Sequence, residues 1–273
     1  MSQRCQRWRA RKAVYRHIGE AFDPSRYAVA PVEERPAREF VCEHHYAGSY
    51  PAARYRVGLF HKEPFAAERL VGVAVFAVPM NQRVVPRYTG CAPSEGVDLA
   101  RFVLLDACPG NSESWFLARA FRCLRAERPD IRAVVSYSDP VPRQALDGTV
   151  VLPGHIGIIY QASGAQYHGR GSARRLLLDA RGRVVSDRLL AKVRREEQGA
   201  GYAVRTLIQA GAPAPRPGED PRAYVERAVS SGAFRSMRHG GNHVYSWRLD
   251  RRGATPPQRY PKAIDPVPME LYR

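Results

Sequence analysis

A hairpin followed by a strand–helix–strand segment constrains the fold of this chain more than any other feature. Residues 54–61 and 70–79 are two β-rich runs separated by a short polar loop, which is typical of a hairpin, and the second run (LVGVAVFAVP) reads as fully buried. Residues 97–105 and 131–138 predict two further strands, with an amphipathic helix over 112–128 between them. A hairpin joined to a βαβ crossover requires a mixed sheet, so we predict an α/β or α+β fold with one open sheet flanked by helices.

The rest of the chain predicts elements on both sides of this centre. We expect a basic arm and linker over 1–38, a catalytic core over 39–180 and a basic C-terminal extension over 181–273. Within them the patterns predict a helix or disordered arm over 1–17, an extended connection over 23–38, helices over 39–46, 154–165, 186–197 and 221–231, a linker over 211–221, strands over 174–178 and 243–249, and an irregular tail over 250–273.

The charge indicates a polyanionic partner. The chain carries a formal net charge of +17, of which residues 170–273 contribute +11. Such a surface attracts phosphate polymers or anionic membranes, although an arginine-rich composition alone would also raise the charge. No window has the roughly 18 consecutive apolar residues of a membrane span, and the basic N-terminus lacks the apolar segment of a secretory signal. Five scattered cysteines without a Cys-x-x-Cys pair favour reduced thiols in a cytoplasm.

Polar and aromatic side chains crowd the segment 135–171, which we interpret as the wall of an active site. Tyr137 and Asp139 end the strand predicted over 131–138, where a sheet delivers side chains to its edge. His155, Tyr160 and Tyr167 follow among glycines and other small residues that let a substrate approach. The alternative for Asp139 is an ordinary Asp-Pro turn.

Two features before this segment favour an anion. Arg101 stands in an otherwise apolar strand, where a charge needs a partner or an anionic ligand unless it faces solvent at the sheet edge. The turn over 105–114 leads into a helix N-terminus, whose free amides favour phosphate or carboxylate, or are simply capped by Ser112 or Ser114. No phosphate-binding loop or dinucleotide-binding glycine motif is present, which disfavours nucleotide hydrolysis and Rossmann redox chemistry.

The sequence Glu43-His44-His45-Tyr46 supplies groups suited to proton transfer or metal binding. Adjacent residues on a helix point in different directions, so at most one of the two histidines is expected in a site. His45, Tyr46 and Asp139 would form an oxygen-rich set suited to iron, and the alternative is a hydrogen-bonded core cluster.

Several segments together resemble the phage Mom family of DNA-modification proteins, over roughly residues 40–171. The segments are CEHHYAGSYP, LVGVAVFAVP, LARFVLLDACPGNSESWFLARAFRCLR, AVVSYSDP and GHIGIIYQASGAQYHG. The resemblance implies a GNAT-like acyltransferase fold and addition of a carbamoylmethyl-type group to the exocyclic amine of adenine in double-stranded DNA, which protects bacteriophage DNA from restriction. It also implies functional positions at His45, Tyr46, Arg101, Ser114, Asp139 and Tyr160.

The usual acetyl-coenzyme A loop of GNAT enzymes is absent, and PGNSES stands in its place. The donor is therefore open between an acyl-coenzyme A and an aminoacyl-tRNA, which would add tRNA to the partners.

The residues are compatible with this chemistry. An adenine amine inside a duplex is out of reach, so the base must be extruded, held by aromatic rings and anchored by cations on phosphates. Tyr137, Tyr160 and Tyr167 can stack, and His155, Arg174 and Arg175 are expected to bind substrate. Asp139 would hydrogen-bond or deprotonate the amine, and Arg101 would stabilise charge on the donor group. The alternatives are a GNAT-type N-acyltransferase for a protein, tRNA or small amine, and a non-catalytic nucleic-acid-binding protein.

Overall fold

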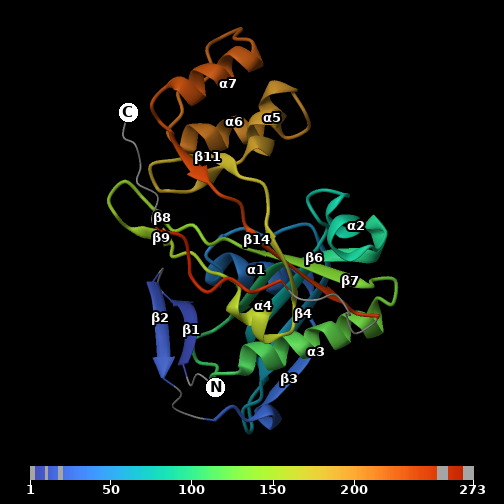
Figure 1. Ribbon diagram of the computed structural model, residues 1–273. Helices are drawn as coiled ribbons and strands as arrows, with labels where there is room; N and C mark the ends of the chain where they lie inside the picture. The colour runs from blue at the N-terminus through green and yellow to red at the C-terminus, as the bar shows by residue number, and fades with distance from the viewer. Residues whose placement is uncertain (1–3, 10–11, 18–20, 251–257, 267–273) are drawn as a thin grey trace. The chain divides into compact units, whose positions relative to one another are not determined.

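The computed structural model describes residues 4–9, 12–17, 21–250 and 258–266, and the chain divides into two compact units. The first unit contains residues 1–139, 155–170 and 242–263, and the second contains 140–154, 171–241 and 264–273. Figure 1 shows the helices and strands of the two units. No helix in the described residues is long and apolar enough to cross a membrane.

A seven-stranded mixed sheet forms the centre of the first unit, in the order β10-β14-β7-β6-β5-β4-β3. Only β6 and β7 run parallel, and every other pair is antiparallel. The mixed open sheet predicted from the sequence is therefore confirmed. Its strands are β3 (Tyr27–Pro31), β4 (Ala53–His61), β5 (Arg69–Ala77), β6 (Gly96–Leu104), β7 (Ala133–Ser138), β10 (Gln166–Arg170) and β14 (His243–Arg248).

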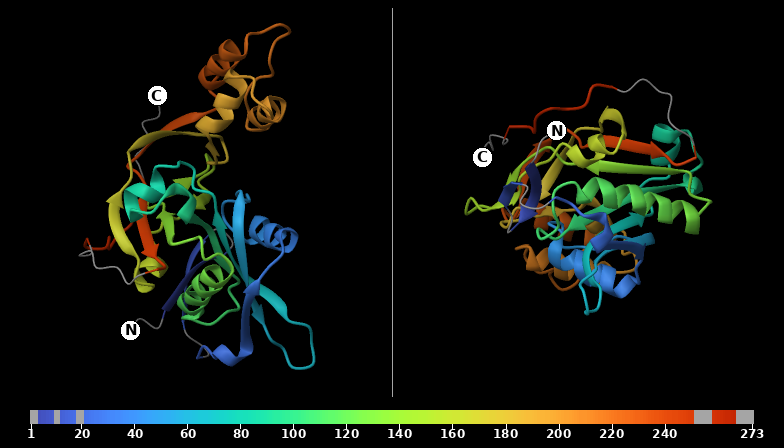
Figure 2. Two further views of the ribbon diagram at one scale, coloured as in Figure 1. Left: turned by 90° about the vertical axis from the view of Figure 1, so that its right-hand side faces the viewer. Right: turned by 90° about the horizontal axis from the view of Figure 1, so that it is seen from below.

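Helices cover both faces of this sheet, as the alternation along β5 shows. Val73 and Val75 pack against α1, whereas Ala74 and Phe76 belong to the core under α3. Figure 2 shows α1 and α3 on opposite sides of the strands. The unit's helices are α1 (Glu34–His44), α2 (Val84–Thr89), α3 (Ser112–Glu127) and α4 (Ile158–Ala162), with 3-10 turns η1 (Pro24–Arg26) and η2 (Pro93–Glu95).

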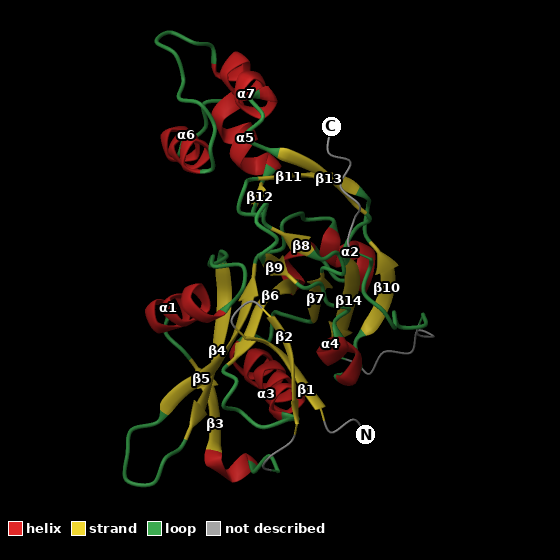
Figure 3. Cartoon of the chain, turned by 90° about the vertical axis from the view of Figure 1, so that its left-hand side faces the viewer, coloured by secondary structure: helices red, strands yellow, loops and turns green. Residues whose placement is uncertain are grey.

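The second unit combines a small sheet with a helical cluster. The sheet has the order β12-β11-β13, β8 pairs with β9, and α5, α6 and α7 share one apolar core (Figure 3). The elements are β8 (Arg143–Gln144), β9 (Val150–Leu152), β11 (Arg174–Leu178), β12 (Val184–Val185), α5 (Asp187–Arg194), α6 (Ala200–Gln209), α7 (Pro221–Ser230) and β13 (Arg235–His239).

The N-terminal predictions need correction. Residues predicted as a basic helix or disordered arm form a hairpin of β1 (Arg4–Arg9) and β2 (Lys12–His17), consistent with the β-formers in these runs. The helix predicted over 39–46 is α1, which begins at Glu34. Pro36 is tolerated there because the first turn of a helix has amides without helical partners.

Three later predictions also need correction. The helix predicted over 154–165 is limited to α4, because Gly157 precedes it with a φ of 68° and ends the helical geometry on that side. The strand over 174–178 exists, but it lies in the small sheet of the second unit. The sequence reading missed β10 and α6 and did not place β14, which lies between β10 and β7 in the main sheet.

Candidate functional site

The parallel strands β6 and β7 separate after a short paired stretch. Their pairing covers three residue pairs and ends at Asp98 and Val135, although β6 continues to Leu104 beside β5. Beyond that point the Ser136 hydroxyl donates a hydrogen bond of 3.1 Å to the Leu99 carbonyl. The two strands are no longer paired beyond Val135, so the sheet is open beside Ser136 and Tyr137.

A β-bulge brings two charged residues of β6 to one face at this opening. Arg101 pairs with Val75 and Leu99 pairs with Phe76, so Ala100 is an extra residue in the strand. Asp98 pairs with Ala77, which shares the face of Val75. Since cross-strand partners share a face, Asp98 and Arg101 both lie on the side of α1, although two residues three apart would face opposite ways in a regular strand.

Asp98 is the residue of this site that the sequence reading missed. Its Oδ1 atom is fully enclosed and has no hydrogen-bond partner among the described residues. Burial raises the pKa of the Asp98 carboxyl to about 7, and the positive charge of Arg101 opposes that rise. The sequence did contain a signal for Asp98. Like Arg101, it is a charged residue within an otherwise apolar strand, where a charge needs a partner or a ligand.

Arg101 is held by the turn that follows α1. Its Nε donates to the Ser49 carbonyl at 2.9 Å, Nη2 donates to Ser49 Oγ at 3.0 Å, and Nη1 donates to the Ala100 carbonyl at 2.7 Å. Burial lowers the pKa of Arg101, and the charges of Tyr46 and Asp98 oppose that effect. Ser49 and the Ala100 carbonyl are therefore partners of the kind that the sequence analysis required for Arg101. They fix its guanidinium next to Asp98.

The end of α1 brings His45 and Tyr46 to the same region. The His45 Nδ1 accepts a hydrogen bond of 3.1 Å from the Ala47 amide, so the neutral ring carries its proton on Nε2. Burial, with a smaller effect from Arg101 and His155, lowers the pKa of His45 to about 3. The Tyr46 ring lies 4.2 Å from the His45 ring and 6.4 Å from the His155 ring, centroid to centroid, and the residue is 41% exposed.

Asp139 and His155 are coupled at the end of β7. The His155 amide donates a hydrogen bond of 2.7 Å to the Asp139 carbonyl. Burial lowers the pKa of His155 to about 4, while the Asp139 charge favours protonation and His243 opposes it. The structure thus brings both predicted residues close to the end of α1.

The predicted tyrosines differ in depth. Tyr160 and Tyr167 are buried in the core on the side of α3, where both rings contact Tyr245. Burial raises the pKa of Tyr160, and a hydrogen bond with Ser136 ties its hydroxyl to the opening. Tyr137 is only partly buried and interacts electrostatically with Asp98. Tyr46 and Tyr137 therefore expose more ring surface for stacking than the two core tyrosines do.

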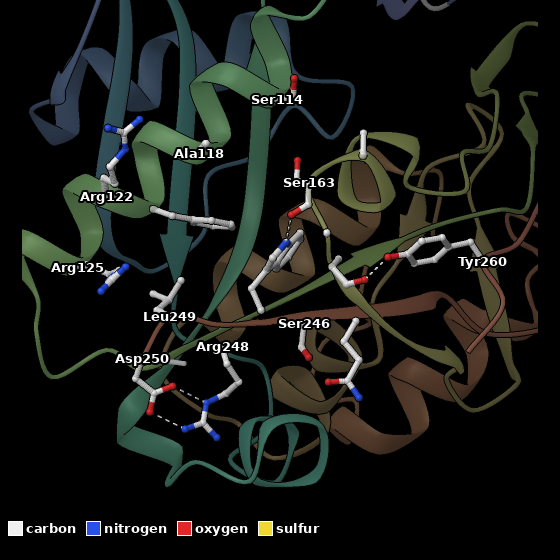
Figure 4. A pocket seen from close by; sticks show the side chains of 16 residues that line it. Ser114, Ala118, Arg122, Arg125, Ser163, Ser246, Arg248, Leu249, Asp250 and Tyr260 are labelled. Carbon is white, nitrogen blue, oxygen red and sulfur yellow. Dashed lines mark hydrogen bonds and ion pairs between the residues drawn. The ribbon is translucent and has the colours of Figure 1, made fainter. Parts of the chain in front are cut away.

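Ser114 lies elsewhere in the first unit. It donates a hydrogen bond of 3.2 Å to the Asn111 carbonyl and lines a pocket of about 920 Å³ beside α3 (Figure 4). The pocket combines the cations Arg122 and Arg125 with Trp247, and neither Asp98 nor any other residue of the opening described above lines it. Its lining residues are Ser114, Ala118, Phe121, Arg122, Arg125, Ala162, Ser163, Gly164, Ala165, Gln166, Ser246, Trp247, Arg248, Leu249, Asp250 and Tyr260.

The remaining predicted residues are Arg174 and Arg175 and the metal set. The two arginines lie on β11 of the second unit. In the part of the chain that the structure describes, no three His, Cys, Asp or Glu side chains come together in a way that could hold a metal ion. Tyrosine is not one of these residue types, so the metal set of His45, Tyr46 and Asp139 stays a prediction.

Comparisons with known proteins complete the description of the site. A solved structure described as a tandem GNAT protein from the clavulanic acid biosynthesis pathway, without acetyl-coenzyme A, aligns with 83% of this chain and all of its own, at 8% identity and a TM-score of 0.41. A search of curated proteins gave no match. The model of the Mom protein family matches residues 26–214, which include α1, the opening between β6 and β7, and β11. Because that match covers well over half of the sequence, the chain belongs to the Mom protein family.

Proposed function

We propose that this protein is a DNA-modifying transferase that adds a small carbamoylmethyl or acyl-derived group to the exocyclic amine of adenine in double-stranded DNA. Membership of the Mom family supports the substrate class. The observation that carries the proposal is the Asp98 carboxyl, whose Oδ1 has no hydrogen-bond partner among the described residues and whose pKa is raised to about 7, beside Arg101 where two parallel strands separate. By this route the protein would protect bacteriophage DNA from restriction in the cytoplasm of the host.

Asp98 is suited to accept the proton of the amine. The adenine amine is a weak nucleophile because its lone pair is delocalised into the ring, so its attack needs a base that removes the proton as the new bond forms. A carboxyl with a pKa near 7 is partly ionised at neutral pH and is a stronger base than an exposed aspartate. Asp98 therefore has the property that the reaction requires.

The reaction then has a simple balance. The amine nitrogen forms a bond to the carbonyl carbon of the donor's thioester or ester, and the bond from that carbon to its carrier breaks, with the electron pair leaving on the carrier. The immediate product is therefore an adenine that carries an acyl-derived group. Asp98 receives the amine proton. Arg101, fixed by Ser49, lies next to the forming charge and stabilises it electrostatically.

The extruded base needs an aromatic surface, and we assign this role to Tyr46 and Tyr137. Both rings are partly exposed, and both interact electrostatically with the Asp98–Arg101 pair. Asp139 is a positioning residue in this scheme, because its carbonyl and its charge hold His155, whose ring lies near Tyr46.

The donor is proposed only by class. An acyl-coenzyme A and an aminoacyl-tRNA are both anionic, and Arg101 supplies a cation beside Asp98 at the opening. A carrier of either kind fits this chemistry.

Mass spectrometry of nucleosides from plasmid DNA co-expressed with the full chain tests the proposal. The parent protein is expected to give modified deoxyadenosine. Asp98→Asn should reduce the yield by about 100-fold or more, since a general base contributes roughly 10²–10⁴. Glu68→Gln, which removes one exposed negative charge, should leave the yield unchanged.

The two parts of the proposal fail separately. Unmodified adenine in the parent sample, with modification found on a protein, tRNA or small amine, would favour an N-acyltransferase of another substrate class. Full modification of adenine by the Asp98→Asn variant would support adenine as the substrate and refute the role of Asp98 as the base.

A further inference from the structure

Two arginines face each other across the small sheet of the second unit. Strands β11 and β13 are antiparallel, and Arg175 pairs directly with Arg238. Both side chains are exposed, and neither has an ion-pair or hydrogen-bond partner within the described part of the chain. Side chains opposite each other in such a pair start about 5 Å apart, and like charges there are destabilising.

The strand register fixes the two arginines on the face opposite the buried residues of this strand pair. The opposite face of the ribbon carries Leu176, Leu178 and Met237, which are buried with Val141. A shift by one residue would expose this apolar set, so the repulsion between Arg175 and Arg238 cannot be relieved by slipping the strands.

Three other arginines of the second unit are neutralised by acidic residues. Arg183 contacts Asp179 at 2.9 Å, Arg188 contacts Glu197 at 2.5 Å, and Arg227 contacts Glu219 at 2.6 Å, each between a guanidinium nitrogen and a carboxylate oxygen. Among the described residues, Arg175 and Arg238 have no such partner. A pair of opposed, unneutralised cations is consistent with an anion supplied from outside the chain.

We propose that the β11–β13 face around Arg175 and Arg238 docks the phosphate backbone of duplex DNA. The inference rests on the proposed function, which makes DNA the substrate, and adds a contact surface remote in sequence from the reacting residues. A duplex presents closely spaced phosphates to such a pair. The face favours a duplex over a single strand because its other paired residues are Leu177 and Ser236, which offer no aromatic ring for an unstacked base.

Binding of a short fluorescein-labelled DNA duplex to the full chain, followed by anisotropy as salt is raised, tests the proposal. Arg175→Gln with Arg238→Gln should reduce the slope of log affinity against log salt by about 2, since each phosphate contact contributes roughly 0.9. The affinity itself should fall about tenfold or more at moderate salt.

A matched control separates this surface from the overall charge. Arg188→Gln with Arg195→Gln removes the same two charges from the same unit, and both of these arginines already contact Glu197. This control should keep the parental salt slope. Equal losses in the two double variants, or no loss in the Arg175 and Arg238 variant, would overturn the proposal.

A single charge reversal separates binding from folding. Arg175→Glu places a carboxylate opposite Arg238, so the cross-strand pair becomes attractive. The melting temperature should equal or exceed that of the parent while duplex affinity falls. A lower melting temperature together with the lower affinity would assign the loss to folding and count against the proposal.

The assay also distinguishes the inference from the proposed function. Binding is measured without turnover, so a chain that leaves adenine unmodified but loses duplex affinity in the Arg175 and Arg238 variant refutes the proposed reaction alone. A chain that modifies adenine but binds the duplex equally well in both forms refutes the docking surface alone.

Discussion

Replacing Asp98 by asparagine should make the protein more stable at high pH and change the pH dependence of its stability. The Asp98 pKa is about 7 in the folded protein against an ordinary value of 3.8, so the folded state favours the protonated carboxyl. Stability from this group is fully present below pH 3.8 and is lost as the pH rises through 7. A shift of about 3 pKa units corresponds to about 4 kcal/mol, of which about 3 kcal/mol falls between pH 5 and pH 8.

Urea denaturation of the parent and of Asp98→Asn at a series of pH values between 5 and 8 measures this difference. Asparagine keeps the shape of the side chain and cannot ionise, so the stability of the variant relative to the parent should rise by about 3 kcal/mol across the range. Glu68→Gln, an exposed control, should show a constant difference from the parent. A constant difference for Asp98→Asn as well would refute the reasoning that its carboxyl is buried without compensation.

Three further results are expected. Burial lowers the pKa of His45 and of His155 below 6.5, so each makes the fold lose stability as the pH falls from about 6.5 towards 4, and His155→Gln should flatten that loss in acid denaturation curves. Gly157→Ala should lower the free energy of unfolding, measured by urea denaturation, by about 2 kcal/mol or more, because φ is 68° and the added Cβ would lie 2.7 Å from a ring carbon of Tyr160. Gly164 has a similar φ but open space around it, so Gly164→Ala should lower the free energy of unfolding by about 1 kcal/mol. Tyr46→Ala should lower the yield of modified nucleoside roughly 5- to 150-fold, the equivalent of about 1–3 kcal/mol of base stacking, whereas Tyr46→Phe should retain it; equal losses in both variants would remove the stacking role.

The central strands could be predicted because their signals are local. Buried runs such as that of β5 and the amphipathic pattern of α3 are visible within single windows of sequence. The position of β14 could not be predicted, because its place between β10 and β7 depends on pairing with residues more than 70 positions away. Its sequence indicates a strand but carries no record of its neighbours.

The candidate site was predictable in part for a related reason. The end of β7 identifies Asp139 and Tyr137 as residues at a sheet edge, and the structure places them there. The pairing of Asp98 with Arg101 could not be foreseen, because their spacing of three puts them on opposite faces of any regular strand. The extra residue Ala100 reverses that expectation, and nothing local in the sequence marks it as a bulge.

The seam between β6 and β7 also has a mechanical consequence. Strands β6 and β7 are joined by three residue pairs and by the hydrogen bond of the Ser136 hydroxyl. This seam connects a group of four strands, β3, β4, β5 and β6, to a group of three, β7, β14 and β10. Asp98 and Arg101 lie on β6 in the first group of strands, and Tyr137 lies on β7 in the second. A wider or narrower seam therefore changes the distance from the Asp98 carboxylate to the Tyr137 ring directly, without unfolding either group of strands.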